Sequence, residues 1–205
     1  MTDGLPGALV LGLAFLLGAT PWGYLLAKST RGIDLRQVGS GGTGATNVQR
    51  TLGTGASIIV SVLDFLKGLL PVLLAKWLDL DQWWVAGVAV AAVVGHCWSP
   101  FIGFKGGKGV ATGAGAAVAL FPATILAVPV LAVIVAFTRY MSLGSLVASA
   151  LTAALAMAAA ITGQLDWPAA WAIVAMVAII AWRHESNIRR LLNGTERRVG
   201  DTVHV

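Results

Sequence analysis

Long apolar stretches alternate with short polar segments along this chain of 205 residues. The apolar stretches cover residues 5–27, 53–77, 83–101, 110–138, 142–162 and 167–182, and the polar segments cover residues 39–50, 95–112 and 183–196. We expect each apolar stretch to be helical, because lipid provides no water to satisfy an open backbone. The pattern predicts an all-α integral membrane protein that forms a single polytopic membrane domain over residues 1–205.

Composition agrees with this prediction and narrows the class of function. Hydrophobic residues make up 57% of the chain and charged residues 11%, and the mean hydropathy is +0.81, outside the range of soluble domains. The single cysteine, Cys97, excludes an internal disulfide and a cysteine-based zinc site, and we expect neither a metal nor a cofactor. The net charge of +5 lies beside apolar spans, where it suits anionic headgroups or anionic substrates rather than nucleic acid.

The charges that flank the spans predict the topology. The first stretch has its cations after it, between residues 28 and 36, so we expect an uncleaved anchor with its N-terminus outside. A single crossing over residues 110–138 would export a tail with five arginines and three acids, against the positive-inside rule. We therefore expect a short broken helical hairpin there, turning near residues 121 and 122.

This reasoning predicts seven transmembrane helices, with the N-terminus outside and the C-terminus cytoplasmic. The expected spans are about 5–27, 53–77, 83–101, 110–121, 122–138, 142–162 and 167–190, followed by a cytoplasmic tail at 191–205. All three polar segments would then meet at the cytoplasmic face.

The first polar segment resembles an anion-binding loop followed by a helix. Four of its residues are glycines, which let the backbone approach a ligand and turn N–H groups inward. Residues 46–49 have capping-box spacing, so we expect a helix to begin there with its positive dipole end toward the glycines. Arg50 lies one turn into that helix. A flexible interfacial turn is the alternative, although it requires neither Arg50 nor the clustered hydroxyls and amide.

The second polar segment contains a cationic glycine turn, residues 105–112, that opens a helix. It is not a Walker A loop, because the glycine spacing differs and Gly109 stands where a hydroxyl would bind magnesium. Phosphate stays a suitable ligand; the alternative is two interfacial lysines that anchor a short helix. His96 and Cys97 point about 100° apart on a helix, so they do not form a nucleophile pair. We expect Cys97 to pack as an apolar residue, whereas His96 suits either packing or the site.

The third polar segment continues the last apolar stretch into the cytoplasm. Arg183, Asn187 and Arg190 share one helical face, and His184 lies one turn from Asn187. Such a face can hold a phosphate and offer a proton carrier near neutral pH. A positive-inside anchor would explain the arginines but neither His184 nor Asn187.

Two charges remain inside the second span. Asp64 and Lys67 are three residues apart, and we expect them to pair because charges at this depth are costly. They either support the site structurally or contact substrate.

The chain has no nucleophile elbow, no Ser-His-Asp set and no dinucleotide fingerprint. The residues alone therefore support a cytoplasmic-side site that binds phosphate.

Three segments resemble the signature motifs of the bacterial acyl-phosphate:glycerol-3-phosphate acyltransferases, the PlsY family. They are VGSGGTGATNVQR at 38–50, GHCWSPFIGFKGGKGVAT at 95–112 and RHESNIRRLLNGTE at 183–196. The resemblance extends to Asp64-x-x-Lys67-Gly68 and to residues 139–143, and it covers essentially the whole chain in order. One departure is Gly42, which stands where many members carry asparagine.

The resemblance implies transfer of a fatty acyl group from acyl phosphate to the 1-hydroxyl of sn-glycerol 3-phosphate, giving lysophosphatidic acid in a bacterial inner membrane. The catalytic residues carried over from the family are Ser40, Arg50, His184 and Asn187. Glycerol 3-phosphate is assigned to Lys108, the surrounding glycines and Thr112, and a phosphate to Ser142. We expect further substrate contacts from Gly41, Thr46, Asn47, Lys67, His96, Gly106, Gly107, Gly109, Arg183 and Arg190, and structural roles for Asp64 and Glu196.

The expected partners are the two substrates and membrane lipids, with no nucleic acid and a monomeric state. Acyl phosphate is already activated, so no covalent enzyme nucleophile is required, and the site need only align the groups and stabilise developing charge. Either His184 or a substrate phosphate could accept the hydroxyl proton. The rival function is an organophosphate transporter, which would need polar access from both faces, although the outer loops are short and acidic. A non-catalytic scaffold would leave the glycine, histidine and asparagine pattern unexplained.

Overall fold

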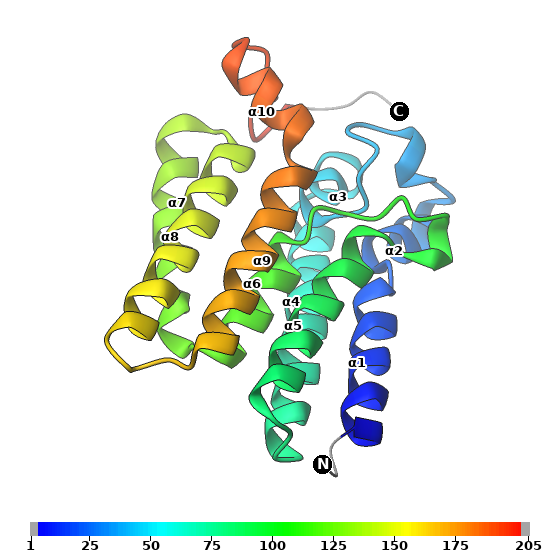
Figure 1. The fold of residues 1–205 in the computed structure, drawn as a ribbon. Coiled ribbons are helices and arrows are strands. Elements are labelled where there is room, and N and C mark those ends of the chain that lie inside the picture. Colours follow the sequence, from blue (N-terminus) through cyan, green and yellow to red (C-terminus); the bar gives the residue numbers. More distant parts are fainter. Residues whose placement is uncertain (1–3, 202–205) are drawn as a thin grey trace.

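The computed structural model describes residues 4–201, and within that part the chain folds into helices and turns with no strand (Figure 1). The α-helices are α1 Gly4–Ala19, α2 Trp22–Arg31, α3 Ala45–Leu52, α4 Thr54–Trp77, α5 Gln82–Cys97, α6 Val110–Leu120, α7 Ala127–Thr138, α8 Met141–Ile161, α9 Trp167–Arg183 and α10 Glu185–Leu192. Three short 3-10 helices join them: η1 Leu35–Gln37, η2 Pro100–Ile102 and η3 Pro122–Leu126. The all-α prediction is therefore confirmed.

Four segments are long and apolar enough to cross a membrane: Gly4–Arg31, Thr54–Trp77, Gln82–Ile102 and Met141–Ile161. The bent pair formed by α9 and α10 would make a fifth, and Val110–Leu120 and Pro122–Thr138 are shorter apolar helices. The seven crossings and their orientation stay predictions. The break expected near residues 121 and 122 is present, because α6 ends in extended backbone at Phe121 and Pro122 begins η3.

The first apolar stretch, expected as a span over residues 5–27, lies within the candidate span Gly4–Arg31, but it is divided into two helices, α1 and α2. It breaks at Thr20 and Pro21, where proline cannot donate the backbone hydrogen bond that would continue α1. The carbonyls freed by the break are used elsewhere. The Ala19 carbonyl accepts a hydrogen bond from Ser99 Oγ at 2.6 Å, and the Thr20 carbonyl accepts one from Lys67 Nζ at 2.8 Å.

The last span also departs from the prediction. Instead of running to residue 190, the helix bends by 60° between α9 and α10. The bend lies at His184, whose ring Nδ1 lies 2.7 Å from the Ile180 carbonyl and whose backbone N–H donates to the same carbonyl at 3.1 Å. Arg183 therefore lies on one side of the bend, and Asn187 and Arg190 lie on the other. Their shared helical face is not formed.

Glycines allow the helices that carry the site to pack backbone against backbone. A side chain at Gly68 of α4 would collide with the Thr112 carbonyl of α6, and one at Gly115 of α6 would collide with the Phe65 carbonyl of α4. Small residues at such contacts are typical of membrane helices, where close van der Waals packing drives association. This contact places Asp64 and Lys67 of α4 next to the first turn of α6, which contains Thr112.

The three polar segments gather at one end of the helix bundle (Figure 1). The loop before α3, the loop between α5 and α6, and α10 all lie at the end opposite the N-terminus. The predicted convergence of the segments is thus present in the fold.

Candidate functional site

The glycine loop of the first segment is held by Asn47. The buried amide Nδ2 lies within hydrogen-bond distance of three carbonyls, those of Leu35, Val38 and Gly42, at 3.2, 3.0 and 2.9 Å. Its Oδ1 accepts a hydrogen bond from the Ser40 backbone N–H at 3.0 Å. Both polar atoms of Asn47 are therefore used within the loop, so this side chain braces the loop, while Ser40 itself is exposed.

Two glycines in this loop have left-handed backbone conformations. Gly39 and Gly41 have φ of 64° and 70°, and a side chain at Gly39 would collide with Asn47 Oδ1. Gly42 differs, because a Cβ there would meet only Ser40 Oγ at 3.7 Å, an ordinary contact. Nothing in the structure requires glycine at position 42, the position where the sequence departs from the family pattern.

Helix α3 follows the loop and carries Arg50. The helix begins at Ala45 with Gly44 as its N-cap and no side-chain cap, so it starts two residues earlier than the spacing predicts, and the capping box is wrong. Arg50 is half-buried and makes no hydrogen bond or ion pair with any residue in 4–201. Burial lowers the pKa of Arg50, Arg197 and Arg190 lower it further, and the carboxylates of Glu196 and Asp201 oppose this.

A cavity of about 160 Å³ lies beside Arg50. Its walls come from two distant parts of the chain: α3 and the start of α4 on one side, and residues 199–201 on the other. Thr46 and Gln49 add a hydroxyl and an amide to the guanidinium of Arg50. The arrangement can accept a small anion.

The glycine turn of the second segment is clamped from two sides. The Gly107 N–H donates to the His96 carbonyl at 3.1 Å, and a side chain at Gly107 would collide with the His96 ring. From α9, Arg183 donates to the Gly107 and Gly106 carbonyls at 3.2 and 3.3 Å and covers the Trp98 ring at 5.5 Å. Arg183 and His96 hold the turn, and the substrate contacts expected of them stay predictions.

Lys108 projects from this clamped turn without a partner of its own. It is half-buried and makes no ion pair or hydrogen bond within the described part of the chain. Burial lowers the pKa of the Lys108 ammonium to about 8; the Glu196 carboxylate opposes the shift, and the cations of Arg190, Arg50 and Arg183 add to it. Gly109 then caps α6 with a left-handed backbone, as the sequence predicts for a turn that opens a helix.

The third segment is organised around the carboxylate of Glu196. Its Oε1 accepts hydrogen bonds from Asn187 Nδ2 at 2.6 Å and from Ser142 Oγ at 2.8 Å, and its Oε2 accepts one from Arg190 Nε at 2.7 Å. Burial raises the pKa of Glu196, but these three donors outweigh it and keep the pKa below its usual value. Glu196 therefore fixes α10 against α8, and the hydroxyl of Ser142, expected to contact phosphate, is engaged with it.

Two acceptor atoms in this segment have no partner among residues 4–201. The Asn187 Oδ1 atom is buried and makes no hydrogen bond there, and its amide is oriented by Glu196. The buried His184 ring is held through Nδ1 by the Ile180 carbonyl, so a neutral ring keeps its proton on Nδ1 and presents Nε2 as an acceptor. Both atoms can accept a hydrogen bond from a hydroxyl.

The intramembrane pair is present as expected. Lys67 Nζ lies 2.8 Å from Asp64 Oδ1, and His96 Nδ1 lies 3.7 Å from the same oxygen and 3.2 Å from Thr112 Oγ1. Asp64 and Lys67 are 2% and 6% exposed. Since Lys67 also donates to the Thr20 carbonyl, its ammonium is committed to the protein, and Thr112 is engaged with His96.

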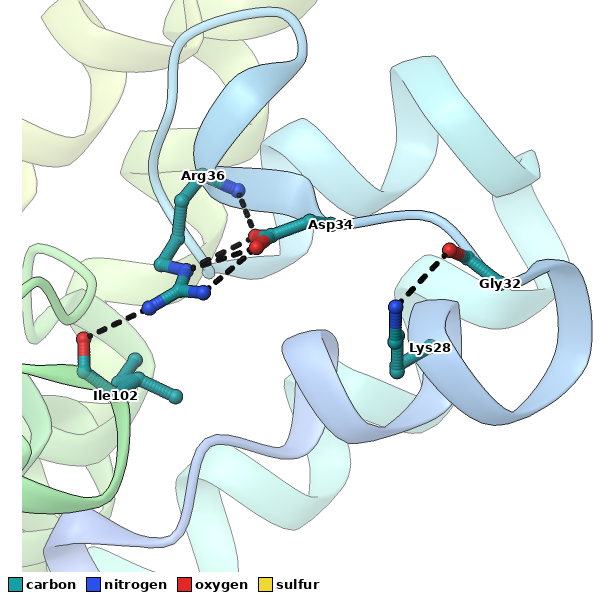
Figure 2. A network of polar contacts seen from close by, with 5 residues as sticks. All are labelled: Lys28, Gly32, Asp34, Arg36 and Ile102. Atoms are coloured by element: carbon teal, nitrogen blue, oxygen red, sulfur yellow. Dashed lines mark hydrogen bonds and ion pairs between the residues drawn. The ribbon is translucent and has the colours of Figure 1, made fainter.

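Some residues of this end of the molecule were not anticipated from the sequence. Residues 195–201 are not a free tail: the Val199 N–H donates to the Arg139 carbonyl at 2.7 Å, and Arg139 Nη2 donates back to the Val199 carbonyl at 2.6 Å. Residues 202–205 of the expected tail lie outside the described residues. Asp34 and Arg36 form a second unanticipated network (Figure 2), for which the only sequence signal was the spacing of two opposite charges in a short loop.

The site thus joins all three segments: the charges that act on Lys108 come from α3, α9, α10 and the returning tail. Within residues 4–201, no group of three His, Cys, Asp or Glu side chains comes together as metal ligands. The site contains two cations without a partner in residues 4–201, Arg50 and Lys108, together with the acceptor atoms of Asn187 and His184. It suits an anionic ligand that also carries hydroxyl groups.

Comparisons with known proteins agree with this chemistry. The family model described as glycerol-3-phosphate acyltransferase matches residues 8–194. The chain is 44% identical over 200 residues to glycerol-3-phosphate acyltransferase 1 of Deinococcus radiodurans, covering 97% of this chain and 98% of that protein. It is 43% identical over 192 residues to a glycerol-3-phosphate acyltransferase of Thermus thermophilus, covering 93% and 94%.

Two crystal structures of PlsY (YgiH), an integral membrane glycerol 3-phosphate acyltransferase, have the same fold. The glycerol 3-phosphate form superposes with a TM-score of 0.88 at 38% identity, covering 95% of this chain and 96% of that one. The lysophosphatidic acid form gives 0.85 at 36% identity, covering 94% and 95%. The family match over most of the chain, together with relatives above 40% identity, shows that the chain belongs to the glycerol-3-phosphate acyltransferase family.

Proposed function

We propose that this protein transfers a fatty acyl group from acyl phosphate to the 1-hydroxyl of sn-glycerol 3-phosphate, forming lysophosphatidic acid and phosphate. The observation that carries the proposal is the pair of unpartnered, half-buried cations Arg50 and Lys108, brought together from two different segments. The reaction requires two phosphate groups in one site, and these cations together with the free N–H groups of Arg190 can hold them.

The chemistry follows from the donor. The hydroxyl oxygen of glycerol 3-phosphate attacks the acyl carbon, the bond from that carbon to the phosphate oxygen breaks, and phosphate leaves. The hydroxyl proton goes either to an oxygen of the leaving phosphate or to His184 Nε2, and Asn187 Oδ1 can orient the hydroxyl. Lys108 and Arg50 stabilise the negative charge that moves to oxygen. No acyl-enzyme is required, and Cys97 is fully buried against Gly109.

An apolar groove beside the cations suits the acyl chain. It is lined by α6, η3, α7, α8 and α9, including Val110, Leu131, Ser149 and Ile173. Val110 follows Lys108 by two residues, and Ile180, at the same end of the lining, supplies the carbonyl that holds His184. A chain in this groove would leave its phosphate beside the cations. Because the groove opens between apolar helices, the donor would enter sideways from the lipid.

We further propose seven crossings of a bacterial inner membrane, with the site on the cytoplasmic side and the protein acting as a monomer. The alternation of helix directions along the bundle and the gathering of the three polar segments at one end support this orientation. Cysteines introduced at Lys105 and at Gly163, both exposed and expected on opposite faces, would test it in intact cells. An impermeant thiol reagent should label only the second, and labelling of both or of Lys105→Cys alone would overturn the orientation.

The activity itself is tested with purified protein in detergent. Given acyl phosphate and radiolabelled glycerol 3-phosphate, the protein should form lysophosphatidic acid without any membrane gradient, and acyl-CoA as donor should give no product. A folded, monodisperse protein that makes no product would refute the proposal. Uptake of glycerol 3-phosphate into vesicles without acylation would instead favour the organophosphate transporter.

A further inference from the structure

Figure 2 shows a polar network that joins the connection between α2 and η1 to the second polar segment. Arg36 Nε lies 2.9 Å from Asp34 Oδ1, and Arg36 Nη2 lies 2.6 Å from Asp34 Oδ2, so the pair has the fork geometry of a bidentate contact. The guanidinium also covers the Tyr24 ring at 5.1 Å. The third guanidinium nitrogen, Nη1, donates a hydrogen bond at 3.3 Å to the carbonyl of Ile102, a residue 66 positions further along the chain.

Each end of this network is attached to one of the two glycine loops. On the first side, the Leu35 side chain is fully buried, and the Leu35 carbonyl is one of the three around the Asn47 amide. On the second side, Ile102 closes η2, and the chain passes through left-handed Gly103 and Phe104 into the clamped turn that carries Lys108. Residues 34–36 therefore lie between the loop that precedes Arg50 and the loop that presents Lys108.

We propose that Arg36 is a positioning residue for acyl transfer, and that its contact with Ile102, aligned by Asp34, sets the distance between the two loops. The proposal rests on the acyltransferase activity of the family and assigns Arg36 no contact with substrate. Two phosphates must be held at once, so a shift of one loop against the other misaligns the hydroxyl and the acyl carbon. Misplacement on the order of 1 Å can cost about 100-fold in rate.

The competing explanation is that Arg36 is one more cytoplasmic cation beside the membrane. Arg31, an exposed arginine in the last turn of α2, provides the matched control for that role. Lysine at position 36 provides the second control, because it keeps the charge but cannot contact both Asp34 and Ile102 with a planar fork. A charge role predicts that Arg36→Lys is normal and that Arg36→Ala equals Arg31→Ala.

The experiment measures glycerol 3-phosphate acylation by the full-length protein in detergent, well below its unfolding temperature. We expect Arg36→Ala to lower kcat/KM by about 10- to 100-fold with a raised KM for glycerol 3-phosphate, and Arg36→Lys to show most of that loss. Arg31→Ala should stay within about twofold of wild type. The double variant Asp34→Ala/Arg36→Ala should be no worse than Arg36→Ala, because the two side chains act as one unit.

Amide hydrogen exchange gives a second measurement that does not depend on turnover. Arg36→Ala should speed exchange in both residues 39–47 and residues 99–109, whereas Arg31→Ala should change neither. A normal KM in Arg36→Lys, or unchanged exchange across residues 99–109 in Arg36→Ala, would overturn the inference. Failure of the wild-type protein to acylate would count against the proposed function, and the exchange data would still decide the role of Arg36.

Discussion

Lys67 and Lys108 were both expected to contact substrate, yet the structure places them in opposite situations. Lys67 is buried in α4, pairs with Asp64 at 2.8 Å and donates to the Thr20 carbonyl. Lys108 is half-buried on a glycine turn and has no hydrogen bond or ion pair within residues 4–201. Lys67 is engaged within the fold, whereas Lys108 keeps its ammonium free within residues 4–201, which supports our proposal that Lys108 binds an anion. The absence of a partner within the protein, more than charge or burial, is therefore the feature that separates a candidate binding cation from a structural one.

The largest effect is expected when the structural pair is broken. Lys67→Met should leave the Asp64 carboxylate buried and uncompensated, lowering the free energy of unfolding by about 3–5 kcal/mol. Thermal unfolding in detergent measures this, and the double variant Asp64→Asn/Lys67→Met should recover much of the loss. If Lys67→Met left stability unchanged and raised only the KM for glycerol 3-phosphate, the distinction between the two lysines would be wrong.

Removal of the Lys108 charge should lower activity and leave stability nearly unchanged, the reverse of the effect expected for Lys67. We expect Lys108→Gln to lower kcat/KM by about 100-fold or more while the unfolding temperature changes little, because a charge that stabilises the reacting oxygen is lost. Lys105→Gln, an exposed lysine in the same turn, is the matched control and should retain nearly full activity. Equal losses in the two variants would mean that the turn supplies only general positive charge.

Loss of the Glu196 carboxylate, which holds the third polar segment together, should have an intermediate effect on stability and turnover. Glu196→Gln keeps the shape of the side chain but removes the charge that accepts hydrogen bonds from Ser142, Asn187 and Arg190. We expect a loss of about 1.5–3 kcal/mol in stability, measured by thermal unfolding, together with reduced turnover. Glu185→Gln serves as the control, because its ion pair with Arg189 is exposed. A Glu196→Gln protein as stable and active as that control would remove Glu196 from the site.

The smallest effect is a pH dependence. Burial lowers the pKa of Lys108 to about 8, so the ammonium loses its proton, and its attraction for phosphate, as pH rises through that value. A substrate phosphate with a second pKa of about 6 stays doubly charged over the same range. The KM for glycerol 3-phosphate should therefore rise by about fivefold between pH 8 and pH 9.

Lys108→Arg should flatten that profile, because arginine keeps its charge. The steady-state KM measured from pH 7 to pH 9.5 checks both variants side by side. A wild-type KM that is constant above pH 8 would show that bound phosphate holds the proton on Lys108, or that Lys108 does not contact it.

The sequence predicted the helical architecture better than the points where individual helices begin, break or bend. The helical class, the break at residues 121 and 122, the Asp64–Lys67 pair and the convergence of the three segments were all correct, because apolar periodicity and loop charge are local properties. The capping box at residues 46–49 and the continuous helix through His184 were wrong, and the break of the first span at Thr20 and Pro21 was not predicted. At the first break the Ala19 and Thr20 carbonyls take hydrogen bonds from Ser99 and Lys67 in distant segments, and at the bend the His184 ring contacts the Ile180 carbonyl of α9.

The order of apolar and polar stretches was enough to predict which residues are candidates for binding a phosphate, and that these residues gather at one end of a helix bundle. Which of these candidates keep a free polar group depends on contacts between segments far apart in the chain. Distant segments supply hydrogen-bond partners to five of them, Asn47, Lys67, His96, Arg183 and Ser142, whereas the side chains of Arg50 and Lys108 have none within residues 4–201. The physical reason is that a polar group in a low-dielectric interior takes the nearest complementary partner, and contacts across 12 to 77 residues create those partners.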